Sequence, residues 1–239
     1  MKRQQEKQKP PAFDQYANHY SALIRDPIRD RFASNGRFFF ERKIQIIRQF
    51  FQRNGVRTES LDWLDVGCGQ GDLLRLGRPY FKSAAGCDPS QEMLKSCEDL
   101  AVRHQSSMDS LPFDDGIFGF ISVVCVYHHV PVERRHLLTT EALRVLKPGG
   151  TLCIIEHNPW NPVTKRIVSR SPVDEDAHLI RPNEAKRLLS SAGCKSFQTQ
   201  FFLLFPERLH RFTRPVEDAL RAFPLGGQYA VFCRSGMAA

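Results

Sequence analysis

The chain has 239 residues, of which 41% are hydrophobic, and this is enough to bury one core but too little for two full domains. Its formal net charge is +8, but Met1–Pro10 alone carries four basic residues against one acidic residue. The remaining basic residues are scattered and form no stripe with aromatic residues, which argues against a nucleic-acid partner.

Cysteine usage and hydropathy indicate the cellular compartment. The seven cysteines include no Cys-x-x-Cys pair and lie mostly within apolar runs, as reduced core residues do. The N-terminus has no apolar signal core, and no apolar run reaches the roughly 18 residues of a membrane span. We therefore expect a soluble, cytoplasmic protein without an integral membrane segment. The sequence leaves its oligomeric state open.

The N-terminal part of the chain is helical in pattern. Residues 1–11 are expected to form a flexible basic tail, and residues 12–57 a helical cap on one side of the domain that follows. Gly55 suits the end of the last cap helix, since glycine commonly terminates helices. The apolar face of this cap consists of Phe38, Phe39, Ile44, Ile46, Ile47 and Phe50.

From Leu61 onward, short β-rich apolar runs alternate with helical patterns, which is typical of a parallel sheet covered by helices. The predicted strands are Leu61–Val66, Ala84–Cys87, Ala101–Gln105, Ile117–Val124 and Thr151–Glu156. The predicted helices are Asp72–Phe81, Gln91–Glu98 and Glu133–Leu146. The predicted fold class is therefore α/β, with an open, doubly wound sheet.

After the fifth predicted strand the chain adds one helix, Asn183–Ala192, and two strands, Phe197–Phe205 and Gln228–Cys233. Between these two strands lie residues 206–227, an unusually long connection whose helical pattern is expected to break at Pro215. We interpret residues 12–239 as one domain, with its core at 58–205, an insertion at 206–227, and a final strand and tail at 228–239.

A glycine-rich segment follows the first predicted strand and reads Asp65-Val66-Gly67-Cys68-Gly69-Gln70-Gly71. Glycine permits a tight turn and leaves room for a ligand against the backbone, because it carries no Cβ. The spacing is Gly-x-Gly-x-Gly, whereas dinucleotide-binding proteins have Gly-x-Gly-x-x-Gly. The carboxylate of Asp65 suits a ligand with an ammonium group better than one with a pyrophosphate.

A second acidic residue, Asp88, stands about 20 residues downstream, at the end of the second predicted strand. A carboxylate at this place can accept hydrogen bonds from both ribose hydroxyls of a bound nucleoside. The same geometry serves nicotinamide cofactors and S-adenosylmethionine, so Asp88 indicates a nucleoside without choosing between them. The alternative interpretation is a helix N-cap that binds no ligand.

Together these motifs resemble those of class I S-adenosylmethionine-dependent methyltransferases, of the type 11-like, small-molecule branch. Leu-Pro-Phe at 111–113 and Leu-Lys-Pro-Gly-Gly at 146–150 extend the resemblance over roughly residues 60–157. The resemblance implies a Rossmann-like, mostly parallel seven-stranded sheet with an antiparallel last strand. It also implies that the cofactor is S-adenosylmethionine and the product S-adenosylhomocysteine.

The resemblance also implies which residues bind the cofactor. In the family, the residues that match Met108 and Asp109 flank the adenine, the apolar one packing on the ring and the acidic one accepting from the amino group. The full expected set is Asp65, Gly67, Cys68, Gly69, Gly71, Asp88, Pro89, Met93, Met108, Asp109 and Cys125.

The fourth predicted strand leads into Tyr127, His128 and His129, which are the candidate catalytic residues because doubly wound sheets bind ligands at the carboxyl ends of their strands. Histidine suits removal of a proton from an acceptor hydroxyl, since its pKa lies near neutral pH. Alternatively, these side chains only line the entry to a helix. Glu156 and His157, at the end of the fifth strand, are reserve candidates for proton transfer.

No metal is expected at the two histidines, because neighbouring side chains should diverge and no third ligand has a suitable spacing. We expect in-line methyl transfer to a small or amphiphilic, lipid-like acceptor, whose reacting atom (O, N or C) the sequence does not determine. A catalytically silent S-adenosylmethionine-binding protein or a nicotinamide-dependent oxidoreductase are the alternatives. Residues 206–227, with Phe13, Tyr16 and Tyr20, are expected to cover the acceptor pocket.

Overall fold

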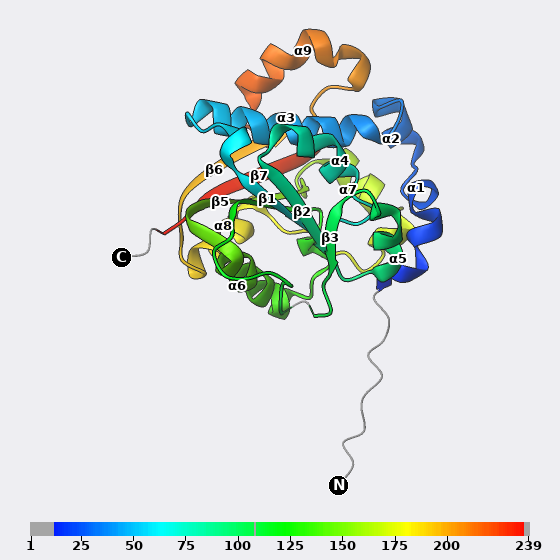
Figure 1. Ribbon diagram of the computed structural model, residues 1–239. Helices are drawn as coiled ribbons and strands as arrows, with labels where there is room; N and C mark the ends of the chain where they lie inside the picture. Colours follow the sequence, from blue (N-terminus) through cyan, green and yellow to red (C-terminus); the bar gives the residue numbers. More distant parts are fainter. Residues whose placement is uncertain (1–11, 108, 237–239) are drawn as a thin grey trace.

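The computed structural model of the protein describes residues 12–107 and 109–236, so the expected basic tail and Met108 lie outside the described residues. Within these ranges, seven strands form one sheet in the order β3-β2-β1-β4-β5-β7-β6 (Figure 1). The strands are β1 Asp62–Val66, β2 Ser83–Asp88, β3 Ala101–His104, β4 Phe118–Val124, β5 Leu146–His157, β6 Cys194–Phe202 and β7 Gln228–Ser235. The α-helices are α1 Tyr20–Leu23, α2 Pro27–Phe32, α3 Arg37–Arg53, α4 Asp72–Gly77, α5 Gln91–Leu94, α6 Arg135–Val145, α7 Pro162–Val168, α8 Pro182–Ser191 and α9 Glu207–Leu220.

The directions of the strands confirm the predicted fold class. β1 pairs in parallel with β2 on one side and with β4 on the other, and β3 and β5 continue the parallel set. β7 is antiparallel to both β5 and β6. The strand order reverses between β1 and β4, and in such sheets ligands bind outside the carboxyl ends of the strands at this reversal.

Helices cover both faces of the sheet. Figure 1 shows α3 across one face and α6 and α8 against the other. On the α3 side, Phe50 stacks on Phe232 of β7, with the ring centroids 4.0 Å apart. The core on the opposite side includes Leu138, Ala142, Val145, Ala185 and Leu189 of α6 and α8. The predicted N-terminal helical cap on one side of the sheet is therefore confirmed. No helix within the described residues is both long and apolar enough to cross a membrane.

Helix α3 is amphipathic, and it also buries two cations. Ile44, Ile47 and Phe51 recur at three- and four-residue spacing, so they lie on one side of the helix and pack in the core. Arg42 is 2% exposed and pairs with Glu217 of α9. Lys43 is also buried, and it lies on the wall of the large cavity described below. The helix therefore links the core to the candidate site.

Two predicted helices are shorter than the sequence pattern suggested. The predicted helix Asp72–Phe81 corresponds to α4, which ends at Gly77 and continues as a 3-10 turn, Arg78–Tyr80, because Pro79 has no N–H to continue the α-helical hydrogen bonds. The predicted helix Gln91–Glu98 corresponds to α5, which ends at Leu94 and continues as a 3-10 turn. Both regions keep the predicted order of elements.

Two predicted strands have shifted ends. The predicted strand Thr151–Glu156 corresponds to β5, which begins earlier because Leu146 already pairs with Phe118 of β4. The predicted strand Phe197–Phe205 corresponds to β6, which ends where Leu203 adopts a positive φ of 62°. This backbone conformation is costly for a residue with a side chain, and it turns the chain out of the sheet.

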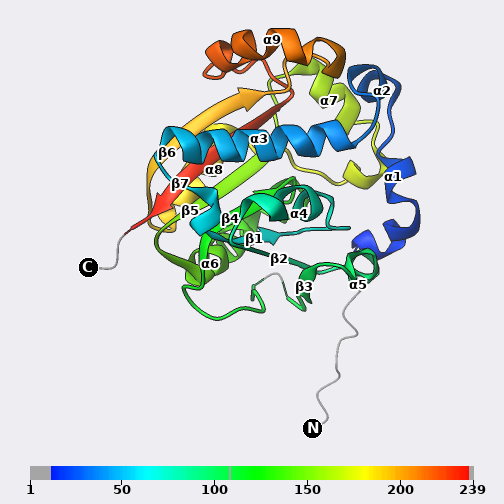
Figure 2. The ribbon, with the colours of Figure 1, turned by 45° about the horizontal axis from the view of Figure 1, so that its top comes forward.

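The insertion at 206–227 folds as helix α9, which lies beside α3 (Figures 1 and 2). The predicted break at Pro215 is wrong, because α9 continues through this residue. A proline inside a helix costs about 3 kcal/mol, so contacts with the rest of the protein must hold the helix together. The buried Arg42–Glu217 ion pair is one such contact, and the Glu217 carboxylate also accepts a hydrogen bond from the backbone N–H of Leu204 at 2.9 Å.

We predict that Glu217→Ala lowers the free energy of unfolding by about 3–5 kcal/mol, because it leaves the buried guanidinium of Arg42 without a charged partner. The double variant Arg42→Met/Glu217→Met should recover most of this loss, since it removes both charges. Denaturation with urea measures both effects. The exposed Arg37–Glu41 pair is the control, because Glu41→Gln should cost less than about 1 kcal/mol. A similar, small cost for Glu217→Ala would contradict the prediction.

Candidate cofactor and acceptor site

A cavity of about 860 Å³ lies at the carboxyl ends of β1, β2, β4 and β5. Its wall includes the residue at or just after the end of each of these strands, namely Gly67, Asp88, Cys125 and His157. Pockets for small ligands typically measure roughly 300–1,000 Å³, so this cavity is large enough to bind a small molecule. The position is the one that the reversal of strand order predicts.

The glycine loop after β1 is fixed to the neighbouring strand by backbone hydrogen bonds. The N–H groups of Gly67 and Cys68 both donate to the carbonyl of Cys87, at 2.8 and 3.0 Å. A Cβ on Gly67 would lie 2.3 Å from Val126, and one on Gly71 would lie 2.3 Å from Leu100. These two glycines are therefore required by protein packing, and Gly71 does not line the cavity.

Gly69 has a different role from its neighbours. It lines the cavity, it has a positive φ of 53°, and a Cβ built on it would meet no protein atom within 4 Å. Its missing side chain therefore leaves open space on the cavity side of the backbone. This is the cradle that a ligand needs in order to lie against the loop.

Asp88 is held against the glycine loop at the edge of the cavity. One carboxylate oxygen accepts from the backbone N–H of Gly69, and the other accepts from that of Ser90, both at 2.8 Å. Burial raises the pKa of Asp88, while these two N–H donors oppose the shift. Each carboxylate oxygen keeps a free lone pair, so Asp88 can still accept two hydroxyl hydrogen bonds.

Asp65 does not lie on the cavity wall. Its side chain is buried on the α3 side of the sheet, because residues two apart in a strand share a face and Trp63 packs there. It accepts a hydrogen bond from the hydroxyl of Ser122 at 2.6 Å, and burial raises its pKa to about 7. Lys43, which the sequence analysis missed, lies on the cavity wall close enough to Asp65 to lower the pKa of that carboxyl, but as a cation it cannot bind an ammonium group in place of Asp65.

The other expected cofactor-binding residues divide into two groups. Those that line the cavity are Gly67, Cys68, Pro89, Met93 and Cys125. Asp109 does not line it, because both of its carboxylate oxygens accept from Arg134 at 2.7 Å on the surface. Gln105, a buried residue directly after β3, lies on the cavity wall in that region.

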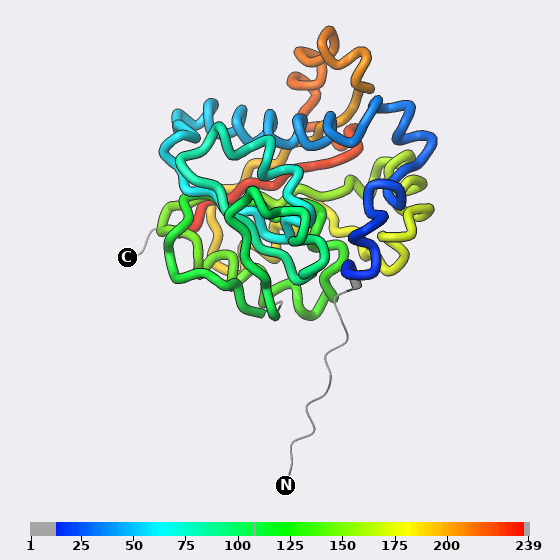
Figure 3. Tube along the Cα trace, turned by 45° about the vertical axis from the view of Figure 1, so that its right-hand side comes forward, coloured from blue at the N-terminus to red at the C-terminus, as the bar shows by residue number. Residues whose placement is uncertain are grey.

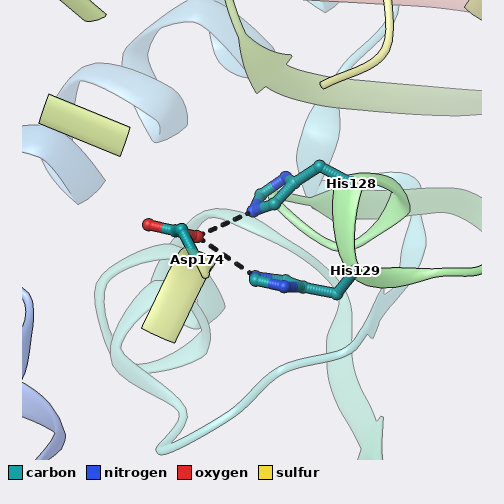
Figure 4. Close-up of side chains that lie close together, drawn as sticks. All are labelled: His128, His129 and Asp174. Atoms are coloured by element: carbon teal, nitrogen blue, oxygen red, sulfur yellow. Dashed lines mark ion pairs between the residues drawn. The ribbon is translucent and has the colours of Figure 1, made fainter. Parts of the chain in front are cut away.

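The segment after β4 brings two histidines together with Asp174, a residue that the sequence analysis did not consider. Asp174 ends a 3-10 turn, Pro172–Asp174, after α7. Figure 4 shows the two imidazoles and this carboxylate pointing toward one another. The Nε2 atoms of His128 and His129 lie 3.3 and 3.4 Å from the same Asp174 oxygen. On its other side, His128 Nδ1 lies 2.5 Å from the Glu156 carboxylate.

The two neighbouring histidines are expected to carry different charges. Burial lowers the pKa of His128, but the charges and hydrogen bonds of Glu156 and Asp174 outweigh burial and raise that pKa to about 9. Burial, and then the positive charge of His128, lower the pKa of His129 to about 4. The same two causes lower the pKa of His157 to about 4. At neutral pH, His128 is therefore a cation, and His129 and His157 are neutral.

This cluster corrects two expectations from the sequence. The donor atoms of His128, His129 and Asp174 all lie within 4.8 Å of one another, so the argument that neighbouring histidines diverge and exclude a metal fails. One oxygen of the Asp174 carboxylate contacts both rings, pairing with the charged His128 and lying 3.4 Å from Nε2 of the neutral His129. Tyr127 points away from the cavity, because its side chain is fully buried and its hydroxyl lies 2.8 Å from the hydroxyl of Thr139.

The N-terminal segment closes one side of the cavity. Phe13, Tyr16 and Tyr20 line it, and the ring of Phe13 meets that of His129 edge-to-face with centroids 4.8 Å apart. The carboxylate of Asp14 accepts a hydrogen bond from the hydroxyl of Ser90 at 2.6 Å. This contact ties the segment to the loop that follows Asp88, so the part of the cavity at Asp88 and the part at the histidines share one cover.

Residues 64–154 match a family model that is described as "Methyltransferase domain". A 2-methyl-6-phytyl-1,4-hydroquinone methyltransferase of Synechocystis sp. is 31% identical over 132 residues, which cover 52% of this chain and 40% of that protein. A tRNA (carboxymethyluridine(34)-5-O)-methyltransferase of Arabidopsis thaliana is 34% identical over 93 residues, which cover 38% of this chain and 22% of that protein. The chain thus spans less than half the length of each of these curated relatives.

The fold has a close counterpart among solved structures. A SAM-dependent methyltransferase of Thermotoga maritima, described as a possible histamine N-methyltransferase, superposes with a TM-score of 0.68 over 93% of this chain and 98% of that chain. Its sequence is 18% identical. The likeness confirms the Rossmann-like methyltransferase fold.

We predict that the stabilisation provided by His128 is lost at alkaline pH. Because the folded pKa of His128 is raised, its contribution is complete below its ordinary pKa of about 6.5 and disappears as the pH rises through about 9. The difference in unfolding free energy between the protein and its His128→Gln variant should therefore shrink between pH 6.5 and 9.5, by on the order of 2–3 kcal/mol.

Urea denaturation at several pH values measures this difference. His136→Gln is the matched control, because His136 is exposed and its variant should track the unmodified protein at every pH. A difference for His128→Gln that does not change with pH would mean that His128 is not the buried cation inferred above.

Proposed function

We propose that this chain, whose residues 64–154 match a methyltransferase family model, is a class I methyltransferase that transfers a methyl group from S-adenosylmethionine to a small or amphiphilic acceptor. One observation carries the proposal. A nucleoside cradle, Gly69 with Asp88, and a histidine–carboxylate cluster lie on the wall of one and the same cavity. Such an arrangement holds two reactants next to each other, which is the main requirement of an in-line displacement.

The residues of the cavity fit the cofactor. The loop at Gly69 offers open space against the backbone, and Asp88 has two free lone pairs for the ribose hydroxyls. Met93 and Cys68 form apolar parts of the cavity wall, and the buried side chain of Gln105 contributes an amide to it. S-adenosylmethionine, when bound, supplies an activated methyl group on its sulfonium, so the protein needs no covalent intermediate of its own.

His129 is the residue we propose for proton transfer when the acceptor is a hydroxyl. Its low pKa keeps the ring neutral at working pH, so it can accept a proton, whereas His128 is already protonated. The carboxylate of Asp174 lies 3.4 Å from His129 Nε2, orients the ring and stabilises the positive charge that develops on it. Asp174 and the Glu156–His128 pair are therefore positioning residues.

An apolar or amphiphilic acceptor suits the remaining wall of the cavity. Aliphatic and aromatic side chains line the part formed by α1, α2 and α3, among them Ile24, Ile28, Phe32, Phe39 and Phe40. The hydroquinone methyltransferase relative acts on a phytyl-substituted ring, which is an acceptor of this kind. The tRNA methyltransferase relative resembles this chain over a shorter stretch, and its acceptor would need a basic, open site.

We predict that Asp88→Ala weakens binding of S-adenosylmethionine and S-adenosylhomocysteine at least about tenfold, and about 10²–10⁴-fold if both hydroxyl hydrogen bonds are lost, since each bond to a charged group is worth about 1.5–3 kcal/mol. Titration calorimetry measures the affinities. Asp109→Asn is the matched control, because Asp109 pairs with Arg134 outside the cavity and its variant should bind normally. Unchanged affinity in folded Asp88→Ala would refute the ribose assignment.

We predict that His129→Gln lowers kcat for a hydroxyl acceptor by about 10²–10⁴-fold and leaves cofactor affinity unchanged, because it removes the general base. Release of S-adenosylhomocysteine, measured across hydroxyl, amine and lipid-like acceptors, identifies a substrate and then tests the variant. His136→Gln is the control.

Activity should also survive treatment with a chelator, because no step of this proposal uses a metal. Loss of turnover on chelation would assign a metal role to the His128–His129–Asp174 cluster. Absence of turnover with every acceptor, despite tight cofactor binding, would favour a catalytically silent binding protein.

A further inference from the structure

Helix α9 turns its polar side toward the protein and its apolar side toward solvent. All three of its acidic residues contact the body of the protein: Glu207 bonds to Ser34, Glu217 to Arg42, and Asp218 lies near Arg53. Figure 3 shows this segment, in orange, projecting from the rest of the chain. The usual arrangement of a surface helix, with its apolar face toward the core, is therefore reversed.

The outward side of α9 and the loop that follows it carry large apolar side chains. Leu209, Phe212 and Val216 recur at three- and four-residue spacing and so share one side of the helix. Phe212 is 76% exposed, and Phe223 and Leu225 in the following loop are 56% and 50% exposed. Isolated apolar residues on a surface need no explanation, but a group of this size does.

Two further exposed residues, Trp160 and Val163 at the start of α7, are tied to the same loop. The side-chain amide of Asn161 donates a hydrogen bond to the carbonyl of Leu225 at 2.8 Å. Of nine large apolar residues that are exposed in the described part of the chain, seven thus belong to this region. We call them the apolar rim: Trp160, Val163, Leu209, Phe212, Val216, Phe223 and Leu225.

Basic side chains surround the apolar rim. On α7, on α9 and in the loop after α9 there are six such side chains, and all six are exposed: Lys165, Arg166, Arg208, Arg211, Arg214 and Arg221. None of the six forms an ion pair with a described residue. The ion pairs of α9 use its acidic residues Glu217 and Asp218. Apolar residues next to unpaired cations are the signature of a segment that lies in the interface of an anionic membrane.

We propose that the apolar rim docks this protein onto the surface of an anionic lipid bilayer. α9 lies in the plane of the interface, its outward apolar residues enter the acyl boundary, and the arginines contact lipid phosphates. The carboxylates of α9 face away from the lipid, because they are bound to the protein body.

The apolar rim reaches the cavity, so docking would bring the cavity close to the bilayer. The role of this docking in catalysis rests on the proposed function. Val163 and Leu225 belong to the apolar rim and also line the cavity. A lipid-like acceptor can therefore pass from the bilayer to the histidine cluster along apolar side chains, without crossing bulk water. The rim thereby assigns the acceptor to the class of membrane-borne amphiphiles.

Two other roles for the rim fit the structure less well. In a symmetric dimer formed through the rim, the same six cations would face each other across the interface and repel. A lid over the acceptor, which the sequence analysis expected, would place α9 on the cavity. Its flanks at Pro206 and Leu225 line the cavity, but no residue of Glu207–Leu220 does.

Co-sedimentation of the full chain with vesicles tests the proposal. The protein should bind vesicles of phosphatidylcholine with 30 mol% phosphatidylglycerol, bind pure phosphatidylcholine vesicles weakly, and dissociate from the anionic vesicles as salt rises. Phe212→Ser should weaken binding to the anionic vesicles at least about tenfold, because a buried phenylalanine side chain is worth about 1.5–3 kcal/mol. Replacing Arg208, Arg211 and Arg214 together by Gln should weaken it about a hundredfold, at about 1 kcal/mol for each cation.

Val132→Ser is the matched control, because Val132 is 60% exposed but lies outside the rim. It should bind vesicles normally, and all variants should bind S-adenosylmethionine normally, which separates this test from that of the proposed function. Absence of binding to anionic vesicles, equal binding to both vesicle types, or equal loss in Phe212→Ser and Val132→Ser would overturn the proposal. A dimer in light scattering that Phe212→Ser dissociates would also overturn it and assign the rim to a second copy of the chain.

Discussion

The reversal of strand order between β1 and β4 is the constraint on which the rest of the site depends. Because the strands beside this point are parallel, their carboxyl ends meet at one edge, and the connections run away from each other to opposite faces of the sheet. This leaves a cavity whose wall is made from strand ends. Asp88 of β2 and His157 of β5 are distant in sequence, yet both reach it.

Buried charge sets the protonation states of the histidines in the cavity. His128 lies between two carboxylates, Glu156 and Asp174, and this sandwich keeps it protonated despite burial. Its positive charge in turn helps to keep the neighbouring His129 neutral. The two adjacent histidines therefore differ in protonation state because their neighbours differ. His128 holds a proton, and His129 can accept one.

The family match covers only part of the cavity wall. The family match at 64–154 contains the glycine loop, Asp88 and both histidines. The cover at Phe13, the carboxylate of Asp174 and the whole of α9 lie outside the match. The glycine loop, Asp88 and the histidines therefore belong to the segment that resembles other methyltransferases, whereas the cover, Asp174 and α9 come from segments outside it.

The sequence by itself determined the sheet, the order of its elements and the place of Gly69 and Asp88, because strand periodicity and glycine turns are local patterns. Only the tertiary structure decided where longer-range partners lie. Asp65 faces the core through the alternation of β1, Asp174 joins the histidines from a turn far along the chain, and α9 docks by its carboxylates. The reason is physical: a local pattern states which residues share a face, but what that face meets depends on packing between segments that are distant in sequence.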